Sequence, residues 1–465
     1  MPDAHEIAAL GNAAILAPAG HGKTEIIANV ASIGRRALIL THTHAGVHAI
    51  RSRLKRLGVQ ERAVAVDTIA GWCMRYAHAF PKIAKPCEGM PKTGAQWDQL
   101  YRGAALALSV AAVRDVVLSS YDRILIDEYQ DCNAGQHALA VALSSIVPTV
   151  IFGDPMQGIF EFAGANLTWN GGIHETFPFA GTLETPHRWT EKNPDLGAWI
   201  ARTRLSLMVG EPIDLSNAPI IYRQSNDAFD MGTFFDGLDA REGTHAAIHC
   251  NKTMCYRLAA ATRGAFQAIE EMASGRLQQF ANAWDSSAQS EGRLAAINSF
   301  IVDCFHIKKP LENEAPDLAD LAMAQEMGML ATYLAGDGGA EATGSLFAIA
   351  RRRPSWRLFR REVWRDAERA LLELSAGRAA SMVEAAARVR QRAANSGRHL
   401  SDRTVSTPLL LKGLEFDHVI IPNASHFQNE QNANAKLFYV AISRATRTLT
   451  ISSPQRFIQF PAARI

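Results

Sequence analysis

A short loop of small residues constrains the fold of this chain more than any other part of its sequence. The loop spans residues 17–24, follows an apolar run at 14–16 and leads into a helix-compatible run at 25–31. A strand, a small-residue loop and a helix in this order are typical of a phosphate-binding loop. Backbone N–H groups of such a loop and the helix N-terminus surround phosphates, at the carboxyl ends of a parallel sheet. The segment therefore predicts an α/β domain that binds a nucleotide.

Two side chains of this loop carry the expected chemistry. Lys23 would bring its positive charge to the β- and γ-phosphates, and Thr24 would bind Mg²⁺. The first loop position is Ala17 where the strict pattern has glycine. The residues that we expect to contact the nucleotide are Ala19, Gly20, His21, Gly22, Lys23, Thr24 and Glu25.

A second apolar run, at 124–126, ends in the two acids Asp127 and Glu128. Carboxylates at the end of a buried strand are costly to keep without a function. We expect Asp127 to hold the metal ion, directly or through water, and Glu128 to orient and deprotonate an attacking water. The loop and the acid pair together predict ATP and Mg²⁺ as cofactors and ATP hydrolysis as the chemistry.

Short β-rich runs alternate with helical patterns in two parts of the chain, which indicates two parallel sheets. The runs lie at 14–16, 37–40, 123–126 and 149–152 in the first part, and at 246–249, 419–421 and 449–452 in the second. We therefore expect a first domain at 1–180 with a helical insertion at about 80–118. A second domain, split in sequence, is expected at 181–310 and 401–465, with a helical accessory insertion at 311–400.

The overall charge gives little guidance, because 48 Lys and Arg residues face 46 Asp and Glu residues, a formal net charge of +2. A nucleic-acid binder of this composition needs a local basic surface. Residues 351–392 are dense in arginine, with Trp356, Phe359 and Trp364 interspersed. Two interpretations stay open for this segment: a solvated helix face, or a surface for nucleic acid or a protein partner.

The N-terminus has no basic stretch followed by an apolar segment, and the most apolar segment, around 104–118, is interrupted by Arg114. We therefore expect no signal peptide, no membrane contact and a cytoplasmic location. The six cysteines are scattered, and Cys250 and Cys255 form the one close pair, which predicts reduced cysteines and no metal cluster.

The sequence Asp127-Glu128-Tyr129-Gln130-Asp131 resembles superfamily 1 DNA helicases of the UvrD, Rep and PcrA group. Further segments follow in the order expected for that family, at 40–45, 67–70, 153–160, 183–188, 412–416 and 439–445. The resemblance implies two RecA-like domains with ATP in the cleft between them. It also implies 3′-to-5′ movement on single-stranded DNA, with single-stranded or tailed duplex DNA as the partner.

The resemblance further implies roles for single residues. Gln157 would sense the γ-phosphate, and Arg188 and Arg444 would reach ATP across the cleft, where an arginine can be worth roughly 10³–10⁵ in rate. The nucleotide-binding set is completed by His187, Gly413 and Glu415. The implied DNA contacts are Thr41, His42, Thr43, Thr68, Phe160, Phe162 and Thr407.

The chain departs from the family pattern in its adenine and DNA contacts. No glutamine precedes Lys23, and His5 lies nearest to the place where one is usual. His187 stands for a tyrosine that stacks on the base, although an imidazole can also hydrogen-bond. In the DNA contacts, His42 replaces a phenylalanine, Ala163 an arginine and Leu409 a histidine.

These departures, with the small insertions, keep a second function open. In size and architecture the chain resembles the helicase subunit of the Gabija anti-phage system, which works with a nuclease-bearing ATPase. We therefore consider a DNA helicase or translocase, as in DNA repair, and a DNA-responsive ATPase subunit that regulates a partner nuclease in antiviral defence. A non-catalytic binding module is the third class, and the complete set of ATP residues argues against it.

Overall fold

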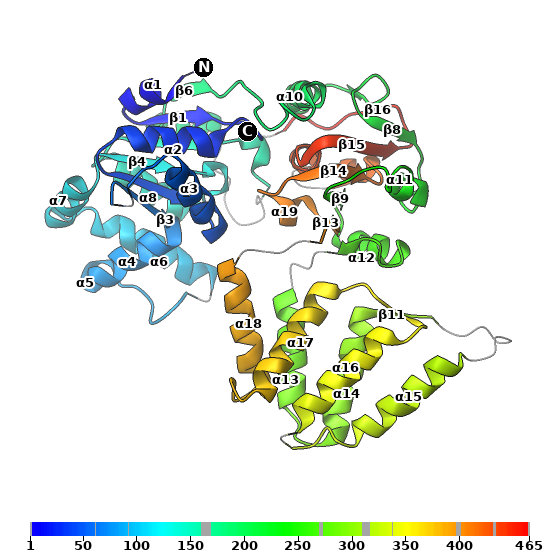
Figure 1. Ribbon diagram of the computed structural model, residues 1–465. Coiled ribbons are helices and arrows are strands. Elements are labelled where there is room, and N and C mark those ends of the chain that lie inside the picture. Colours follow the sequence, from blue (N-terminus) through cyan, green and yellow to red (C-terminus); the bar gives the residue numbers. More distant parts are fainter. Residues whose placement is uncertain are drawn as a thin grey trace. The chain divides into compact units, whose positions relative to one another are not determined.

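The structure is a computed structural model, and it describes residues 2–60, 62–91, 93–159, 169–268, 273–308, 317–336, 338–396, 401–430 and 434–463. The chain forms two compact units (Figure 1). Unit 1 comprises Met1–Tyr222, Ala424–Leu449 and Gln455–Ile465, and unit 2 comprises Arg223–Asn423 and Thr450–Pro454. Residues 181–222 and 424–449, which we expected in the second domain, thus group with the phosphate-binding loop.

A six-stranded sheet in the order β3-β2-β4-β5-β1-β6 forms the centre of unit 1. All its strand pairings are parallel. The strands are β1 (Ala13–Leu16), β2 (Ala37–Thr41), β3 (Val64–Thr68), β4 (Arg123–Ile126), β5 (Thr149–Gly153) and β6 (Phe179–Thr182). Because the strands are parallel, the loops after β1, β4 and β5 all leave the same edge of the sheet.

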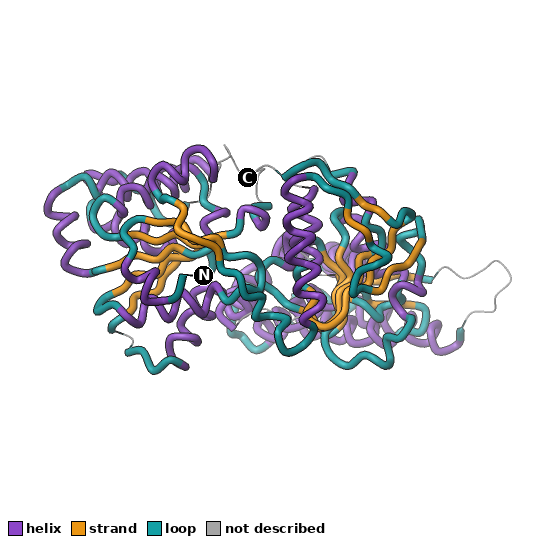
Figure 2. Tube along the Cα trace, turned by 90° about the horizontal axis from the view of Figure 1, so that it is seen from above, coloured by secondary structure: helices purple, strands orange, loops and turns teal. Residues whose placement is uncertain are grey.

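Helices cover this sheet on both faces, as Figures 1 and 2 show. Along β4, Ile124 and Ile126 belong to one apolar cluster and Leu125 to another, as the alternation of a strand requires. The cluster around Leu125 is completed by α1 (Ala4–Ala9), α2 (Lys23–Ile33) and α3 (His44–Arg56). The opposite cluster is completed by α4 (Ile69–Ala79), α6 (Gly94–Ala107), α7 (Ala111–Ser120) and α8 (Ala134–Ser144).

Further helices and turns complete unit 1. They are α5 (Pro81–Ala84), η1 (Tyr129–Asp131), η2 (Pro155–Gln157), the π-helical turn η4 (Trp169–Ile173), α9 (His174–Thr176), α10 (Pro194–Val209), α20 (Ser425–Gln428) and α21 (Asn434–Ile442). A small antiparallel sheet pairs β7 (Ile213–Asp214) with β16 (Phe457–Ile458).

A second six-stranded sheet has the order β10-β13-β9-β14-β15-β8. The pairings of β10 with β13, β13 with β9 and β9 with β14 are parallel. The strands are β8 (Ile221–Gln224), β9 (His245–Ile248), β10 (Gln267–Ala268), β13 (Arg403–Ser406), β14 (Phe416–Ile421) and β15 (Ala445–Ser453). The helices α11 (Met231–Phe235), α12 (Lys252–Ala261) and α19 (Pro408–Leu411) accompany them.

A helical body with its own core makes up the rest of unit 2. Its helices are α13 (Ala273–Asp285), α14 (Ser290–Cys304), α15 (Leu318–Ala331), α16 (Gly339–Arg352), α17 (Arg361–Ser375) and α18 (Met382–Ser396). Its core includes Phe300, Phe347 and Trp364, and β11 (Phe305–Ile307) pairs with β12 (Trp356–Leu358) at one end. Since α13 and α14 contribute to this core, the helical body begins earlier in the chain than residue 311.

The predicted fold class, α/β with two parallel sheets and helical insertions, is confirmed. Each apolar run that we predicted as a strand lies within a strand or overlaps one, from β1 to β15. The edge strands β3 and β6 were missed because they are only partly buried and lack a continuous apolar run.

No disulfide joins any of the six cysteines, all of which lie among the described residues. Within the described part of the chain, no single helix is long and apolar enough to cross a membrane. The consecutive helices α6 and α7 reach that length only together, and the chain bends by 90° between them.

The contact between α5 and α6 yields a first prediction. A Cβ atom at Gly103, within α6, would lie 2.2 Å from the carbonyl oxygen of Ala84, whereas one at Gly94 in the same helix meets nothing within 4 Å. We expect Gly103→Ala to lower the free energy of unfolding by about 1–3 kcal/mol, because the backbones must separate. Gly94→Ala is the control, with no loss and a gain of at most ~1 kcal/mol from helix propensity. Urea unfolding followed by circular dichroism compares the two, and equal midpoints would contradict the close contact.

Candidate active site

The phosphate-binding loop connects β1 to α2 and has the backbone geometry that an anion requires. Gly20 and Gly22 have φ values of +75° and +77°, in the left-handed region that glycine tolerates. Gly22 is also the N-cap of α2 and supplies no side-chain cap. The first N–H groups of α2 therefore stay available for a phosphate, and the helix dipole favours a negative charge there.

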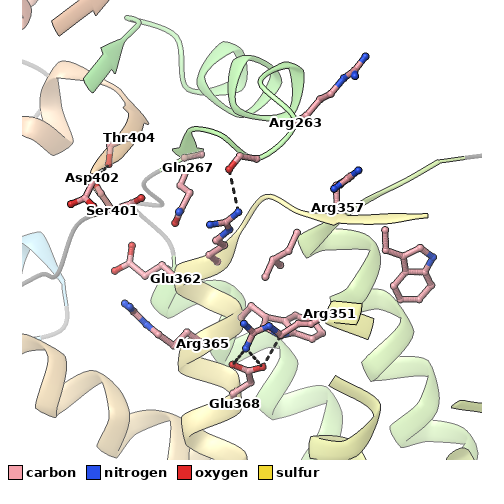
Figure 3. A pocket seen from close by; sticks show the side chains of 16 residues that line it. Arg263, Gln267, Arg351, Arg357, Glu362, Arg365, Glu368, Ser401, Asp402 and Thr404 are labelled. Atoms are coloured by element: carbon pink, nitrogen blue, oxygen red, sulfur yellow. Dashed lines mark hydrogen bonds and ion pairs between the residues drawn. The ribbon is translucent and has the colours of Figure 1, made fainter. Parts of the chain in front are cut away.

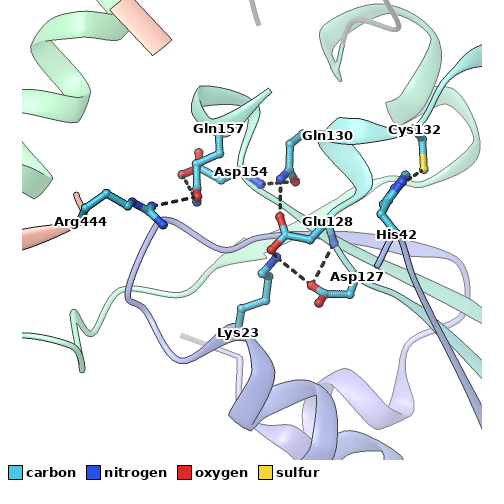
Figure 4. Close-up of polar contacts among 9 residues, drawn as sticks. All are labelled: Lys23, His42, Asp127, Glu128, Gln130, Cys132, Asp154, Gln157 and Arg444. Atoms are coloured by element: carbon cyan, nitrogen blue, oxygen red, sulfur yellow. Dashed lines mark hydrogen bonds and ion pairs between the residues drawn. The ribbon is translucent and has the colours of Figure 1, made fainter. Parts of the chain in front are cut away.

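The Lys23 ammonium lies between Asp127, the predicted metal ligand, and Glu128, the predicted general base, as Figure 4 shows. Its Nζ atom is 2.7 Å from Asp127 Oδ1 and 2.5 Å from Glu128 Oε1. The side chains of Lys23 and Asp127 are almost completely buried, with 12% and 7% of their surface exposed. Because β1 and β4 end at the same edge of the sheet, residues 104 positions apart in the sequence meet here.

Burial and charge act against each other on these groups. Burial alone would lower the pKa of Lys23, but the carboxylates of Asp127 and Glu128 outweigh it and hold that pKa above its usual value. Burial raises the pKa of Asp127, and the nearby Lys23 ammonium opposes that rise. The ion pairs therefore keep a lysine charged in a site that would otherwise favour its neutral form.

Glu128 adopts an uncommon backbone conformation at the start of η1. Its φ is +55°, a region that costs a residue with a Cβ roughly 1–2 kcal/mol. Its N–H donates to Asp127 Oδ1 over 2.9 Å, and the Gln130 amide donates to its carboxylate. Local strain of this kind is found at functional sites, where the surrounding contacts fix it. Here it directs the Glu128 carboxylate toward Lys23.

The loop after β5 brings Gln157 into the same network. The Asp154 side chain accepts from the Met156 N–H and from the Gln157 amide, which lies 3.1 Å away. Asp154 is fully buried, and the Arg204 guanidinium donates to it over 2.8 Å and 3.2 Å. Both Arg204 donors bind Asp154 Oδ1 and the Gln157 amide binds Oδ2, so this buried ion pair fixes the turn that carries Gln157.

Arg444, the second predicted arginine, lies beside Gln157. Its Nη2 atom is 3.4 Å from Gln157 Oε1 and 2.8 Å from Ser443 Oγ, and its Nε donates to the Val440 carbonyl over 3.0 Å. Only 1% of Arg444 is exposed. The loop between α21 and β15 thus presents the guanidinium to the residue that we predicted as the γ-phosphate sensor (Figure 4).

The segment after β6 contacts the phosphate-binding loop directly. The Arg188 N–H donates to the Gly20 carbonyl over 3.0 Å, and its Nη1 donates to the Ser443 carbonyl over 2.5 Å. A Cβ atom at Gly22 would lie 3.0 Å from His187 Cδ2. His187, Arg188 and Arg444 therefore lie with the loop in unit 1. Their predicted action across a cleft between two domains stays a prediction.

Of the remaining residues predicted to bind the nucleotide, some lie in or next to the loop of unit 1 and others lie in unit 2. Thr24 lies in the first turn of α2. Glu25 forms an ion pair with Arg53 of α3 at 2.6 Å. His21 is buried and its Nδ1 lies 2.8 Å from the Ala19 carbonyl oxygen, and burial lowers the pKa of its imidazole. Gly413 and Glu415 lie in unit 2, in the loop before β14.

Several predicted DNA-contacting residues have local structural roles. Thr43 and Thr68 are the N-caps of α3 and α4, and each hydroxyl accepts from a glycine N–H. Thr41 is buried at the end of β2, and His42 Nε2 lies 3.5 Å from Cys132 Sγ. Thr407 precedes α19 in unit 2 without making a side-chain cap. Phe160, Phe162 and the departure at Ala163 lie outside the described residues.

Sequence reasoning missed four residues that hold this site together: Asp154, Arg204, Trp189 and Tyr439. The Tyr439 hydroxyl accepts from the Ala19 N–H over 3.1 Å, and the Trp189 indole donates to the Ala445 carbonyl over 2.6 Å. Tyr439 and Asp154 stand within the family-like segments and could have been included on that basis. Arg204 belongs to α10, outside those segments, and no sequence signal distinguishes it from a surface arginine.

The donor set fits Mg²⁺. The Thr24 hydroxyl and the Asp127 carboxylate are hard oxygen ligands, which this ion prefers. Among the described residues, no group of three or more His, Cys, Asp or Glu side chains could form a closed metal site. Mg²⁺ is commonly held by one or two protein carboxylates and completes its shell with phosphates and water.

Comparison with known proteins adds two family matches. Residues 92–178 match the UvrD/REP helicase N-terminal domain, and residues 405–452 match the UvrD-like helicase C-terminal domain. The first segment contains Asp127, Glu128 and Gln157, and the second contains Arg444, whereas Lys23 and Arg188 lie outside both. A search of curated proteins returns no match.

Among solved structures, one similar chain comes from the complex structure of Arterivirus nonstructural protein 10 (helicase) with DNA. Its sequence identity is 13% and the TM-score is 0.27, and the alignment covers 51% of this chain and 47% of that chain. The match thus spans about half the length of each protein, and at this score it carries no argument about fold or function. The two family matches cover 87 and 48 of the 465 residues, so the chain contains one segment similar to the N-terminal domain and one similar to the C-terminal domain of UvrD-like helicases.

Proposed function

We propose that this protein hydrolyses ATP with Mg²⁺ and couples hydrolysis to movement on DNA, as a superfamily 1 helicase or translocase. The observation that carries the ATPase proposal is the Lys23 ammonium held between Asp127 and Glu128 at the start of α2, whose N-cap residue Gly22 supplies no side-chain cap. The DNA partner, the 3′-to-5′ direction and the placement of ATP in a cleft between two domains rest on the family resemblance.

Each residue of the site has a place in this proposal. When phosphates enter the loop, Lys23 exchanges its carboxylate partners for the β- and γ-phosphate oxygens. Thr24 and Asp127 hold Mg²⁺, which when bound neutralises part of the phosphate charge. Glu128, released from the Lys23 ion pair, accepts the proton of the attacking water, and Gln157 orients that water.

The two arginines stabilise the charge that develops on the γ-phosphate. Arg188 donates a hydrogen bond to the Ser443 carbonyl, and Arg444 donates one to the Val440 carbonyl. The neighbouring Tyr439 hydroxyl accepts from the Ala19 N–H of the phosphate-binding loop. A shift of the 439–445 segment would therefore move Arg188, Arg444 and the loop together. Such coupling is what a motor needs in order to convert hydrolysis into movement.

The acid pair and its lysine give the next prediction. Lys23→Ala and Glu128→Gln should each lower ATP turnover by a factor of at least ~10², because one removes the phosphate contact and the other the general base. Phosphate release under saturating ATP measures this loss. The exposed residues Lys82 and Glu211 provide the controls Lys82→Ala and Glu211→Gln, which should retain the wild-type rate. Wild-type protein without turnover, with or without DNA, would refute the ATPase proposal.

The arginines are tested with a conservative change. Arg188→Lys and Arg444→Lys keep the charge but lose the planar guanidinium, so turnover should fall by roughly 10²–10³ while ATP binding is largely kept. The matched control is Arg447→Lys at an exposed position of β15. If Arg444→Lys turns over like the control, Arg444 has a structural role only.

A second candidate function is a DNA-responsive ATPase subunit that regulates a partner nuclease, as in anti-phage defence. The observation that favours it is His42, which contacts Cys132 at a position where the family pattern has a DNA-stacking phenylalanine. We expect single-stranded DNA to stimulate ATP hydrolysis under both functions. Unwinding of a 3′-tailed duplex by the isolated protein supports the helicase. Stimulation without unwinding, together with a nuclease recovered by pull-down from the native cell, supports the regulatory subunit.

A further inference from the structure

A groove in unit 2, separate from the predicted ATP residues, is rich in arginines, which make up five of its 16 lining residues. It has a volume of about 720 Å³, and its walls come from the helical body and from the strands β10 and β13 (Figure 3). The arginines that line it are Arg263, Arg351, Arg357, Arg361 and Arg365. All five are exposed. Four of them, all except Arg263, belong to the arginine-dense segment 351–392 for which the sequence left two interpretations open.

The acids in the groove compensate only part of this charge. Glu362, Glu368 and Asp402 also line it, so five positive charges face three negative ones. Glu368 accepts from Arg351, with an Nη1 to Oε1 distance of 3.3 Å, and Arg361 donates to the Gly264 carbonyl. Within the described part of the chain, no hydrogen bond or ion pair engages the guanidinium groups of Arg357 and Arg365. These two arginines are therefore available to an anionic ligand.

The first turn of α17 also lines the groove, through Arg361 and Glu362. The N-cap residue of this helix is Arg360, whose guanidinium has no acceptor atom and instead donates to the Asp303 carbonyl over 2.6 Å. The side chain at this N-cap thus cannot satisfy the N–H groups of the first turn, a place that Ser, Thr, Asp or Asn usually takes. An anion in the groove would meet a helix N-terminus as well as arginines.

The aromatic residues of the groove help to distinguish a mononucleotide from a polymer with repeated phosphates as its ligand. Trp364 is buried in the helical core, and the Trp356 ring lies under the Arg353 guanidinium at 4.2 Å. Neither ring is therefore placed to stack on a free base, as a mononucleotide pocket would require. A wide, open groove with arginines on several elements fits a ligand with repeated phosphates better than a small enclosed one.

We propose that this groove binds the phosphodiester backbone of a nucleic acid strand without reading its sequence. The proposal rests on the proposed function for the identity of the polymer, and it adds a contact in unit 2 that the ATP site does not provide. Arginine is suited to this task because its planar guanidinium matches the geometry of a phosphate and stays charged.

The test compares two double variants of the full-length protein that remove the same charge. Arg357→Ala with Arg365→Ala removes the available arginines of the groove. Arg202→Ala with Arg352→Ala is the control, because both residues are exposed and neither lines the groove. Fluorescence anisotropy without ATP measures the Kd of a labelled single-stranded oligonucleotide and of its blunt duplex over a range of salt concentrations. Urea unfolding checks that both variants fold like the wild type.

We expect the groove variant to bind about tenfold more weakly than the control at low salt, since each lost phosphate contact costs part of the electrostatic free energy. The slope of the logarithm of the binding constant against the logarithm of the salt concentration should also become shallower. Two lost phosphate contacts, at ~0.7 each for the single strand or ~0.9 each for the duplex, reduce its magnitude by about 1.4 or 1.8. Equal Kd and slope in both variants would overturn the proposal, as would a wild type that binds neither probe. Displacement of the oligonucleotide by poly-glutamate at an equal charge concentration would also overturn it, since the groove would then select any polyanion.

Because binding is measured without ATP, the two proposals fail separately. If the protein binds DNA through the groove but hydrolyses no ATP, the proposed ATP-driven function is contradicted and the proposed DNA binding by the groove is supported. If the protein hydrolyses ATP but the two double variants bind DNA equally, the proposed role of the groove is contradicted and the proposed ATPase function is not affected.

Discussion

The ion pairs of Lys23 with Asp127 and Glu128 are the interaction on which the candidate active site depends. A buried ammonium without partners would lose its charge, and the buried Asp127 carboxylate and the partly exposed Glu128 carboxylate would repel each other without a cation. The lysine and the two carboxylates therefore stabilise each other's charged forms. The same charges are exchangeable, because phosphate oxygens can replace the carboxylates at the lysine and a metal ion can replace the lysine at Asp127. The arrangement is stable in itself and also suited to a nucleotide.

Around this pair, unit 1 is assembled from distant parts of the chain. Tyr439 contacts Ala19 across 420 positions of sequence, and Arg444 contacts Gln157 across 287. The segment with Arg188 links both through the Gly20 and Ser443 carbonyls. The phosphate-binding loop is thus held by hydrogen bonds to segments that follow it by more than 150 residues, so its geometry depends on the fold of the whole unit.

The arginine groove of unit 2 illustrates a different use of charge. At the ATP residues, charges are buried, paired and fixed, which suits one small ligand in one position. In the groove they are exposed and partly unpaired, which suits a long ligand that can slide. A net charge of only +2 for the chain conceals this difference, because the acids are distributed elsewhere.

The sequence by itself predicted central strands of both sheets, but not the edge strands β3 and β6. It also predicted roles for Lys23, Thr24, Asp127 and Glu128, because a phosphate-binding loop and a strand-end acid pair are local patterns. The structure decided what joins these patterns. Arg204 on Asp154, Tyr439 at the loop and the grouping of residues 181–222 and 424–449 with it follow from packing between distant segments. The arginines at 351–365 were visible in the sequence, but only the folded helical body gathers them beside β10 and β13. Long-range contacts of this kind leave no periodicity or spacing in the chain, which is why the tertiary structure was needed.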